Sequence, residues 1–324
     1  MIRAAIVGLG RWGQIMVNSV QGKSETIQFT AGVTRTVSKA KTFADEQGFP
    51  LSSDYTVLLA DADIDAIILA TPHTQHAEQI ALAAAARKHV FVEKPFTLTA
   101  ADAVASVEAA EDAKVVLSLG HNRRFMPSWT ELKRRIDSGS LGTILHAETN
   151  FSGSGGLQYR PGGWRADRVE SPAGGMSGMG IHMIDTLIGL FGRISEVHCV
   201  SIRRAIVIDV DDTTSMLLRF ENGMTGYLGT FNATVHTQTV RVFGSKGSAE
   251  IRQERNFEFR PVEGEAEAID FGAFDKERAE LEAFAAAITD GAPYPLPASE
   301  AIHGIEVYEA IIESTETGRT VSVG

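Results

Sequence analysis

The sequence predicts an α/β protein in which a doubly wound parallel sheet is followed by a mostly antiparallel sheet with helices. Apolar runs alternate with helical segments over the first third of the 324 residues. A glycine-rich turn directly follows the first apolar run. After about residue 121, strands separated by short turns replace this alternation. We therefore expect two domains, at residues 1–122 and 123–324.

Each strand of the first domain is expected as a continuous apolar run, because a parallel sheet is buried on both faces. The runs DAIILA and KVVLSL have this character, and helical stretches fill the gaps between the runs. The expected strands are residues 3–7, 27–33, 66–70, 90–92 and 115–119.

The second domain is expected to open with a short helix at residues 129–136 and a strand at residues 144–151. A Gly-rich stretch follows at residues 152–175. This stretch is longer than the usual connection between two elements of a compact domain, so we expect a functional lid or a binding loop.

Antiparallel strands are expected from residue 194 to about residue 260. Asn222-Gly223 is a strong hairpin signal between the apolar runs at residues 216–220 and 224–231. The remaining expected features are a turn at residues 245–247, a helix at 276–289, a proline-rich linker at 293–297 and a helix at 299–313.

The chain carries 30 Lys and Arg residues against 41 Asp and Glu residues, a formal net charge of −11. This acidity argues against nucleic acid or an anionic membrane as the main partner, since both need a concentrated basic patch. A small-molecule ligand is the better expectation. The single cysteine, Cys199, excludes an intramolecular disulfide and a cysteine-rich zinc site, and no metal site is expected.

The N-terminal sequence lacks the features of a secretory signal. The longest apolar stretches fall far short of the roughly 20 residues that span a bilayer. A cytoplasmic protein is expected.

The glycine-rich turn reads GLGRWG, a G-x-G-x-x-G pattern between a strand and a helix. Its first glycine, Gly8, permits the tight turn, Gly10 lets the main chain approach a pyrophosphate, and Gly13 allows close helix-to-strand packing. The N-terminus of the helix offers amide donors to phosphate groups. We expect a dinucleotide cofactor here, with Arg11 and Trp12 among its contacts.

The second strand ends at Thr34 and Arg35, where an NAD enzyme usually places an acidic residue for the ribose hydroxyls. No carboxylate stands at this point. Arg35, with Ser38 and Lys39 nearby, could hold a 2′-phosphate through charge-assisted hydrogen bonds, which favours NADP over NAD. Alternatively, Arg35 stacks on the adenine and the protein uses both cofactors.

Four further motifs are TPHTQH from Thr71 to His76, EKP from Glu93 to Pro95, NRRF from Asn122, and GGMSGMGIHMID over residues 174–185. Together with the glycine turn, this set resembles the Gfo/Idh/MocA oxidoreductase family over essentially the whole chain. The resemblance implies a Rossmann domain followed by an α/β domain with an open sheet. It also implies hydride exchange between a nicotinamide and a secondary alcohol or hemiacetal of a sugar-like substrate.

Lys94 is the expected catalytic residue of the first domain. It stands where the fourth parallel strand ends, at the carboxyl edge where open α/β sheets bind ligands. A desolvated lysine near a nicotinamide has a lowered pKa, so it can hydrogen-bond the reacting oxygen and help to move its proton. Pro95 matches a family position at which the Lys-Pro bond is often cis.

By the resemblance, His182 is the catalytic residue that accepts the hydroxyl proton as hydride leaves. Many family members have an aspartate four residues earlier, where this chain has Gly178. If residues 175–190 form a helix, Asp185 lies on nearly the same face as His182 and could orient it. Gly178 and Gly180 inside a helix would indicate that the cofactor or a bulkier substrate packs closely there.

The resemblance also assigns further contacts. Trp164 and Arg165 offer a stacking face and a clamp for an anion or a hydroxyl, although Arg165 could instead pair with Asp167. His73 and His76 line the nicotinamide end of the groove, or else cap backbone amides at a helix entry. The other implied cofactor contacts are Thr71, Pro72, Glu93, Lys94 and Asn122, and the implied substrate contacts are Lys94, Asn122, Trp164, Arg165, His182 and Asp185.

The leading hypothesis is an NADP- or NAD-dependent dehydrogenase or reductase acting on a sugar, cyclic polyol or dihydrodiol. A cofactor-binding regulator without turnover is the alternative, favoured by Gly178 and opposed by Lys94 and His182. A third hypothesis is hydride transfer between two sugars through a tightly held nicotinamide, or reduction of an imine or enol bond. A homodimer or homotetramer is expected, because an uncovered apolar sheet face must be buried, and residues 216–220 and 224–231 are candidates for that face.

Overall fold

The computed structural model describes residues 1–324, which divide into two compact units. Unit 1 comprises residues 1–122 and 275–298, and unit 2 comprises residues 123–274 and 299–324. The expected boundary after residue 122 is where the chain first leaves unit 1. Residues 275–298 differ from the expectation, because their helix buries its apolar side chains in the core of unit 1 instead of the second domain.

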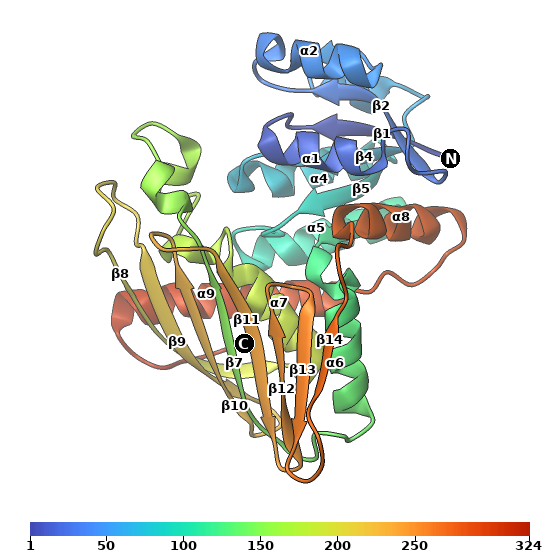
Figure 1. Ribbon diagram of the computed structural model, residues 1–324. Helices are drawn as coiled ribbons and strands as arrows, with labels where there is room; N and C mark the ends of the chain where they lie inside the picture. The colour runs from blue at the N-terminus through green and yellow to red at the C-terminus, as the bar shows by residue number, and fades with distance from the viewer. The chain divides into compact units, whose positions relative to one another are not determined.

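A six-stranded parallel sheet with the order β3-β2-β1-β4-β5-β6 forms the centre of unit 1 (Figure 1). The five expected strands are confirmed, and β3 is a two-residue addition that no apolar run indicates. Strand β4 is buried along its whole length, as its apolar run predicts. The strands are β1 (Ile2–Val7), β2 (Ile27–Val33), β3 (Leu51–Ser52), β4 (Ala66–Leu69), β5 (His89–Glu93) and β6 (Leu117–Gly120).

One helix of unit 1 comes from late in the chain. Helix α8 places Leu281 and Phe284 in the core beneath β1 and β2, and Phe284 meets Phe91 edge to face at 5.7 Å. Arg278 of α8 donates through Nε to the Ser19 carbonyl of α1 at 2.9 Å. The helices are α1 (Arg11–Val20), α2 (Val37–Gln47), α3 (Thr56–Ala60), α4 (His76–Ala85), α5 (Ala100–Ala113) and α8 (Lys276–Thr289).

Unit 2 is built on a nine-stranded sheet that is mostly antiparallel, and only the β7–β10 pair is parallel. The hairpins predicted at Asn222-Gly223 and at Ser245 are confirmed and join β9 to β10 and β11 to β12. In sheet order, the strands are β14 (Glu267–Asp270), β13 (Asn256–Pro261), β12 (Gly247–Arg252), β11 (Thr237–Gly244), β7 (Ile144–Ser152), β10 (Thr225–Phe231), β9 (Thr213–Phe220), β8 (Ile194–Ile202) and β15 (Val321–Ser322).

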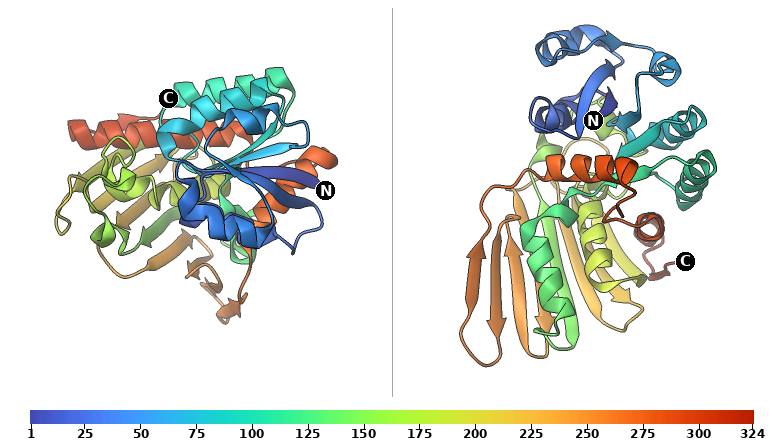
Figure 2. Two further views of the ribbon diagram at one scale, coloured as in Figure 1. Left: turned by 90° about the horizontal axis from the view of Figure 1, so that it is seen from above. Right: turned by 90° about the vertical axis from the view of Figure 1, so that its right-hand side faces the viewer.

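Helices α6 (Pro127–Asp137), α7 (Gly180–Phe191) and α9 (Ala298–Thr317) lie on one face of this sheet (Figure 2). Helix α7 is buried on nearly every side, which fits its almost wholly apolar sequence. Two side chains of α9 hold the main chain of β8. His303 Nε2 accepts the Ile194 N–H at 3.0 Å, and Ser314 Oγ accepts the Cys199 N–H at 2.8 Å.

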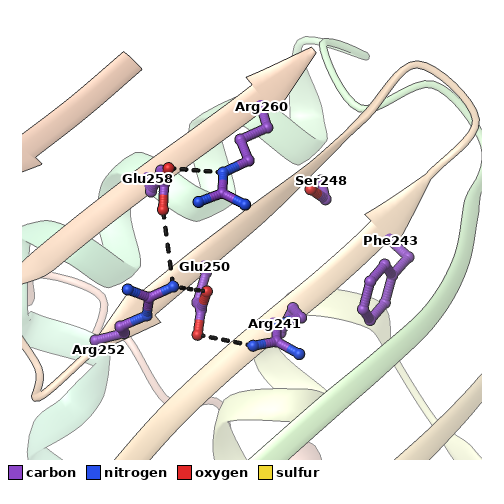
Figure 3. A pocket seen from close by; sticks show the side chains of 7 residues that line it. All are labelled: Arg241, Phe243, Ser248, Glu250, Arg252, Glu258 and Arg260. Atoms are coloured by element: carbon purple, nitrogen blue, oxygen red, sulfur yellow. Dashed lines mark hydrogen bonds and ion pairs between the residues drawn. The ribbon is translucent and has the colours of Figure 1, made fainter. Parts of the chain in front are cut away.

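The opposite face of the sheet carries no helix (Figure 2). Side chains alternate between the faces, so Met216 and Leu218 are 2% and 3% exposed, whereas Leu217 is 60% exposed. Across β11, β12 and β13 the open face carries alternating charges (Figure 3). These charged residues, with Phe243 and Ser248, line a shallow cavity of about 320 Å³; the charged residues are Arg241, Glu250, Arg252, Glu258 and Arg260.

The Gly-rich stretch contains three short 3₁₀ turns, η3 (Gly155–Gln158), η4 (Trp164–Ala166) and η5 (Gly174–Met176). Tyr159 from this stretch packs against Ile206 and Val210 of the loop between β8 and β9. The Asp212 carboxylate fixes that loop by accepting the N–H groups of Ala205 and Ile206 at 2.6 and 2.9 Å. The two segments therefore pack against each other.

No helix of the protein is both long and apolar enough to cross a membrane.

Candidate functional site

The glycine turn between β1 and α1 closes tightly against the end of β4. Gly8 has a φ of +98°, and a Cβ on it would lie 2.4 Å from the Ala70 carbonyl oxygen. A Cβ on Gly13 would lie 2.0 Å from the Gly8 carbonyl oxygen. Gly10 differs, because nothing lies within 4 Å of its Cβ position. The first and third glycines thus serve packing, and the second leaves an open approach to the main chain.

This open approach fits the pyrophosphate of a dinucleotide. Helix α1 begins directly after Gly10, has no acidic residue in its first turn, and has no side-chain hydrogen bond at its N-cap. Such an N-terminus favours an anion through its amide groups and its dipole. Arg11 is exposed beside the turn, whereas Trp12 packs partly against the core of unit 1.

The end of β2 presents a second feature that fits a phosphate. Arg35 and Ser38 are exposed around the start of α2, whose first turn contains no acidic residue. The main chain here is fixed by the Thr34 N–H, which donates to the Ser52 carbonyl at 3.0 Å. Positive charge at a helix N-terminus without a competing carboxylate attracts an anion.

Lys94 stands at the carboxyl edge of the parallel sheet. Strands β4 and β5 pair with Leu69 opposite Val92, so Thr71 and Lys94 follow two neighbouring strand ends. The Lys94–Pro95 peptide bond is cis, as the resemblance implies. This edge is where open α/β sheets bind their ligands.

Glu93 is a buried carboxyl group directly beside Lys94. Glu93 is only 5% exposed, and its Oε2 accepts the Lys94 N–H at 3.3 Å. Gly120 on β6 makes room for it, because a Cβ there would lie 2.8 Å from Glu93 Oε1. Burial raises the pKa of Glu93 to about 7, although the charge of Lys94 and the Trp12 indole act in the opposite direction. A group that can hold a proton near neutral pH therefore adjoins Lys94.

Two histidines follow β4. His73 is 8% exposed, and its ring centroid lies 6.0 Å from that of His76. His76 has no exposed surface, and its ring nitrogens face main-chain carbonyl oxygens of Thr71 and Pro95. The partners in these contacts are acceptors and not the amide donors that a cap would bind.

Asn122 is buried and donates through Nδ2 to Glu277 Oε1 of α8 at 3.2 Å. Glu277 lies far away in the sequence and belongs to no recognisable motif. Only the return of residues 275–298 to unit 1 brings this carboxylate to the end of β6.

In unit 2, His182 lies in the first turn of α7 and is 4% exposed. Its main-chain N–H donates to the Met179 carbonyl at 3.2 Å, and its ring lies 6.0 Å from the ring of Phe151. Phe151 is on β7, so the ring of His182 lies against a side chain of the sheet.

Asp185, on the next turn of α7, forms a buried ion pair with Arg124. Arg124 Nε donates to Asp185 Oδ1 at 2.9 Å, and its NH1 lies 2.6 Å from Glu300 Oε2. This pairing indicates that Asp185 anchors α7. The sequence alone indicated neither the pairing of Asp185 with Arg124 nor that of Arg124 with Glu300. The sequence feature that could have indicated a close neighbour of α7 is Gly189, a glycine inside a helix. A Cβ on it would lie 3.0 Å from Arg124 Cζ.

The expected helix over residues 175–190 starts later than predicted. Helix α7 begins at Gly180, so Gly178 lies outside it and carries no cost from helix propensity. No protein atom lies within 4 Å of a Cβ on Gly178, so close packing there would have to come from the cofactor or the substrate. At Gly180 the expectation of close packing fits, but the neighbour is Met176, whose Sδ would lie 2.2 Å from a Cβ.

Trp164 and Arg165 lie together in the Gly-rich stretch. Arg165 Cζ is 4.0 Å from the centroid of the Trp164 ring, which gives a cation–π pair. Asp167, the alternative partner considered for Arg165, accepts the Val169 N–H through Oδ1 at 2.9 Å. The structure contains no group of three or more His, Cys, Asp or Glu residues arranged to hold a metal ion.

Two family models match the chain. Residues 2–121 match the oxidoreductase family with an NAD-binding Rossmann fold, and residues 129–250 match the GFO/IDH/MocA C-terminal domain. The chain is 29% identical to the uncharacterized oxidoreductase YrbE of Bacillus subtilis, covering 99% of this chain and 96% of that protein. It is also 29% identical to D-xylose 1-dehydrogenase (NADP(+)) 2 of Haloferax volcanii, with 90% of each chain covered.

A crystal structure of a putative NADPH-dependent oxidoreductase from Desulfitobacterium hafniense has the same fold, with a TM-score of 0.93. The two sequences are 26% identical, and the match covers 99% of this chain and 97% of that one. The matched models, the glycine turn and the strand-end Lys94 together identify the protein as a member of the GFO/IDH/MocA family of NAD-binding oxidoreductases.

Proposed function

We propose that the protein is an NADP(H)-preferring dehydrogenase or reductase that transfers hydride to or from a secondary alcohol or carbonyl of a sugar, cyclic polyol or dihydrodiol. The observation that carries this proposal is Lys94 at the end of β5, on the sheet edge that also carries the open glycine turn. Relatives named as dehydrogenases of D-xylose, of inositol and of trans-1,2-dihydrobenzene-1,2-diol support this range of substrates.

The preference for NADP rests on the end of β2. Arg35 and Ser38 are exposed at a helix start without a carboxylate, which suits a 2′-phosphate better than a pair of ribose hydroxyls. The D-xylose dehydrogenase relative is named as an NADP enzyme. Gly10 and the amides of α1 would hold the pyrophosphate, and Thr71, Pro72, His73, Glu93 and Asn122 would surround the nicotinamide end of the cofactor.

The bound nicotinamide supplies the hydride acceptor or donor. In the oxidation direction, Lys94 Nζ hydrogen-bonds the reacting oxygen and stabilises the negative charge that develops on it. His182 accepts the hydroxyl proton through its ring, and Trp164 and Arg165 hold the rest of the substrate by stacking and by hydrogen bonds. Asp185 contributes by fixing α7 through Arg124 rather than by taking the proton itself.

Fluorescence titration with NADPH and NADH, followed by a turnover screen of polyols, sugars and dihydrodiols, tests this proposal. Wild type is expected to bind NADPH more tightly, and Arg35→Asp is expected to reverse the preference. Lys94→Ala is expected to abolish turnover and to retain nucleotide binding, because the glycine turn is unchanged. No binding of either nucleotide would refute the proposal, and binding without turnover of any compound would refute the enzymatic part.

A homodimer or homotetramer is the proposed assembly, formed through the open face of the unit 2 sheet. Leu217, Val200 and Ile202 are 60%, 53% and 43% exposed on neighbouring strands β9 and β8 of that face. Burying them against a second copy would remove apolar surface from water. Light scattering after size exclusion should show that Leu217→Arg yields monomers, whereas the control Leu82→Arg on α4 should leave the assembly intact.

A further inference from the structure

His76 makes an unusual set of contacts for the first residue of a helix. Its Nδ1 lies 2.9 Å from the Pro95 carbonyl oxygen and 3.3 Å from that of Phe96. Its Nε2 lies 3.2 Å from the Thr71 carbonyl oxygen. Side chains at helix starts usually accept hydrogen bonds from helix amides, whereas this one faces three acceptors. The ring therefore works as a donor that joins two loops.

The joined loops leave neighbouring strands at the ligand edge of unit 1. Thr71 follows β4, and Pro95 follows β5 after Lys94. A neutral imidazole has one N–H, and an imidazolium has two. The shortest contact and two of the three acceptors lie on the Nδ1 side, so we assign the proton of a neutral ring to Nδ1. The contact with Pro95 is then the principal one.

We propose that His76 is a positioning residue whose Nδ1–H holds the Pro95 carbonyl and thereby fixes the turn that aims Lys94. The Lys94 main chain is held on both sides. Its N–H donates to Glu93 Oε2 at 3.3 Å, and the carbonyl of the following residue accepts from His76 at 2.9 Å. The burial of His76 excludes water from this bond, which strengthens it.

The kinetic part of this inference rests on the proposed function of Lys94. An error of about 1 Å in the place of a reacting group can reduce turnover roughly 100-fold. Loss of the bond to Pro95 should therefore lower kcat much more than it weakens nucleotide binding. The glycine turn proposed to bind the nucleotide follows a different strand, β1.

A matched pair of variants separates the two sides of the ring. The amide nitrogen of Asn and Nδ1 of His are both three bonds from Cα, whereas the amide nitrogen of Gln and Nε2 of His are both four bonds away. His76→Asn can thus keep the bond to Pro95, whereas the amide of His76→Gln can reach only the Thr71 carbonyl, to which an unprotonated Nε2 does not donate. His76→Leu has no donor at either place.

His89→Leu is the control for a general loss of stability. His89 lies at the opposite end of β5, and its Nδ1 accepts the Val116 N–H at 3.0 Å. Its removal also breaks a bond between a histidine and the main chain of unit 1, but at the edge away from Lys94. Thermal unfolding of each variant identifies a temperature at which all of them are folded, and the variants are compared at that temperature.

Two readouts are used, kcat with NADPH saturating, and the NMR signal of Lys94 after reductive ¹³C-methylation of the lysines. The signal is assigned by its disappearance in Lys94→Arg. In His76→Gln and His76→Leu, kcat is expected to fall roughly 10- to 100-fold and the Lys94 signal to shift. His76→Asn and His89→Leu are expected to stay within about threefold of wild type in kcat, with the signal in place.

Equal losses in His76→Asn and His76→Gln, or an unchanged Lys94 signal in His76→Gln, would overturn the inference. A wild type without turnover on any compound would contradict the proposed function instead. The NMR comparison needs no substrate, so it decides the role of His76 in either case. If His76→Leu does not fold, the Asn and Gln variants still give the decisive contrast.

Discussion

Arg124 and Asp185 form an ion pair inside unit 2, with side chains only 3% and 5% exposed. Arg124 Nε donates to Asp185 Oδ1 at 2.9 Å, and Gly189 leaves space for the guanidinium against α7. Burial acts to lower the pKa of Arg124, but the carboxylates of Asp185 and Glu300 outweigh this and raise it. The pair fixes the helix that carries His182.

Asp185→Asn is therefore expected to lower the free energy of unfolding by about 3 kcal/mol, because it leaves a buried guanidinium with less compensating charge. Urea unfolding followed by circular dichroism measures the loss. Lys41→Ala, which breaks the exposed pair with Asp45, is the control and should change little. A loss in Asp185→Asn no larger than in the control would contradict the anchoring role.

The first two glycines of the turn should separate folding from binding. Gly8→Ala is expected to destabilise the protein by about 2 kcal/mol or more, because its φ is +98° and its Cβ would meet the Ala70 carbonyl. Gly10→Ala has open space, so its unfolding should stay close to wild type while its Kd for NADPH rises roughly tenfold. Differential scanning fluorimetry and fluorescence titration check the two effects. Unchanged NADPH binding in Gly10→Ala would argue against pyrophosphate contact at this residue.

Glu93 should make stability depend on pH in a defined direction. Burial raises its folded-state pKa from 4.5 to about 7, so its favourable contribution is complete below about pH 4.5 and is lost as pH rises through 7. Glu93→Gln removes this loss, and the variant should gain at most roughly 3 kcal/mol relative to wild type between pH 4.5 and 8.5. Chemical unfolding of both proteins at the two pH values measures the gain. The same difference at both pH values would show that Glu93 does not titrate in this range.

Gly178→Asp should be tolerated by the fold. Nothing lies within 4 Å of its Cβ position, and it precedes α7, so neither a clash nor helix propensity opposes the aspartate. Gly174→Ala is the contrast, because Gly174 has a φ of +62° and its Cβ would lie 2.2 Å from the Asp211 carbonyl oxygen. Thermal unfolding should place Gly178→Asp within a few degrees of wild type and Gly174→Ala well below it. Equal losses would mean that the space at Gly178 is filled in solution.

Much of the fold follows from local patterns in the sequence. The five apolar runs of unit 1 became strands β1, β2, β4, β5 and β6, because burial on both faces of a parallel sheet requires such runs. The hairpin at Asn222-Gly223 could also be predicted from the sequence, since its turn geometry depends on those two residues. The glycine turn and Lys94 could be located for the same reason, as each depends on a strand and the residues directly after it.

Other features depended on contacts between distant residues. The apolar pattern of α8 predicts a helix but not the sheet on which it packs, so its place in unit 1 and the bond from Glu277 to Asn122 were hidden. The start of α7 at Gly180 and the space at Gly178 likewise depend on what surrounds them.

The strands, the dinucleotide turn, the family and Lys94 could all be predicted from the sequence, because these features depend on neighbours within a few residues. The partners of the buried polar groups became known only from the folded structure, namely Arg124 for Asp185 and the carbonyl groups of Thr71 and Pro95 for His76. A buried donor must find an acceptor wherever the fold places one, and that choice is made by packing rather than by sequence spacing.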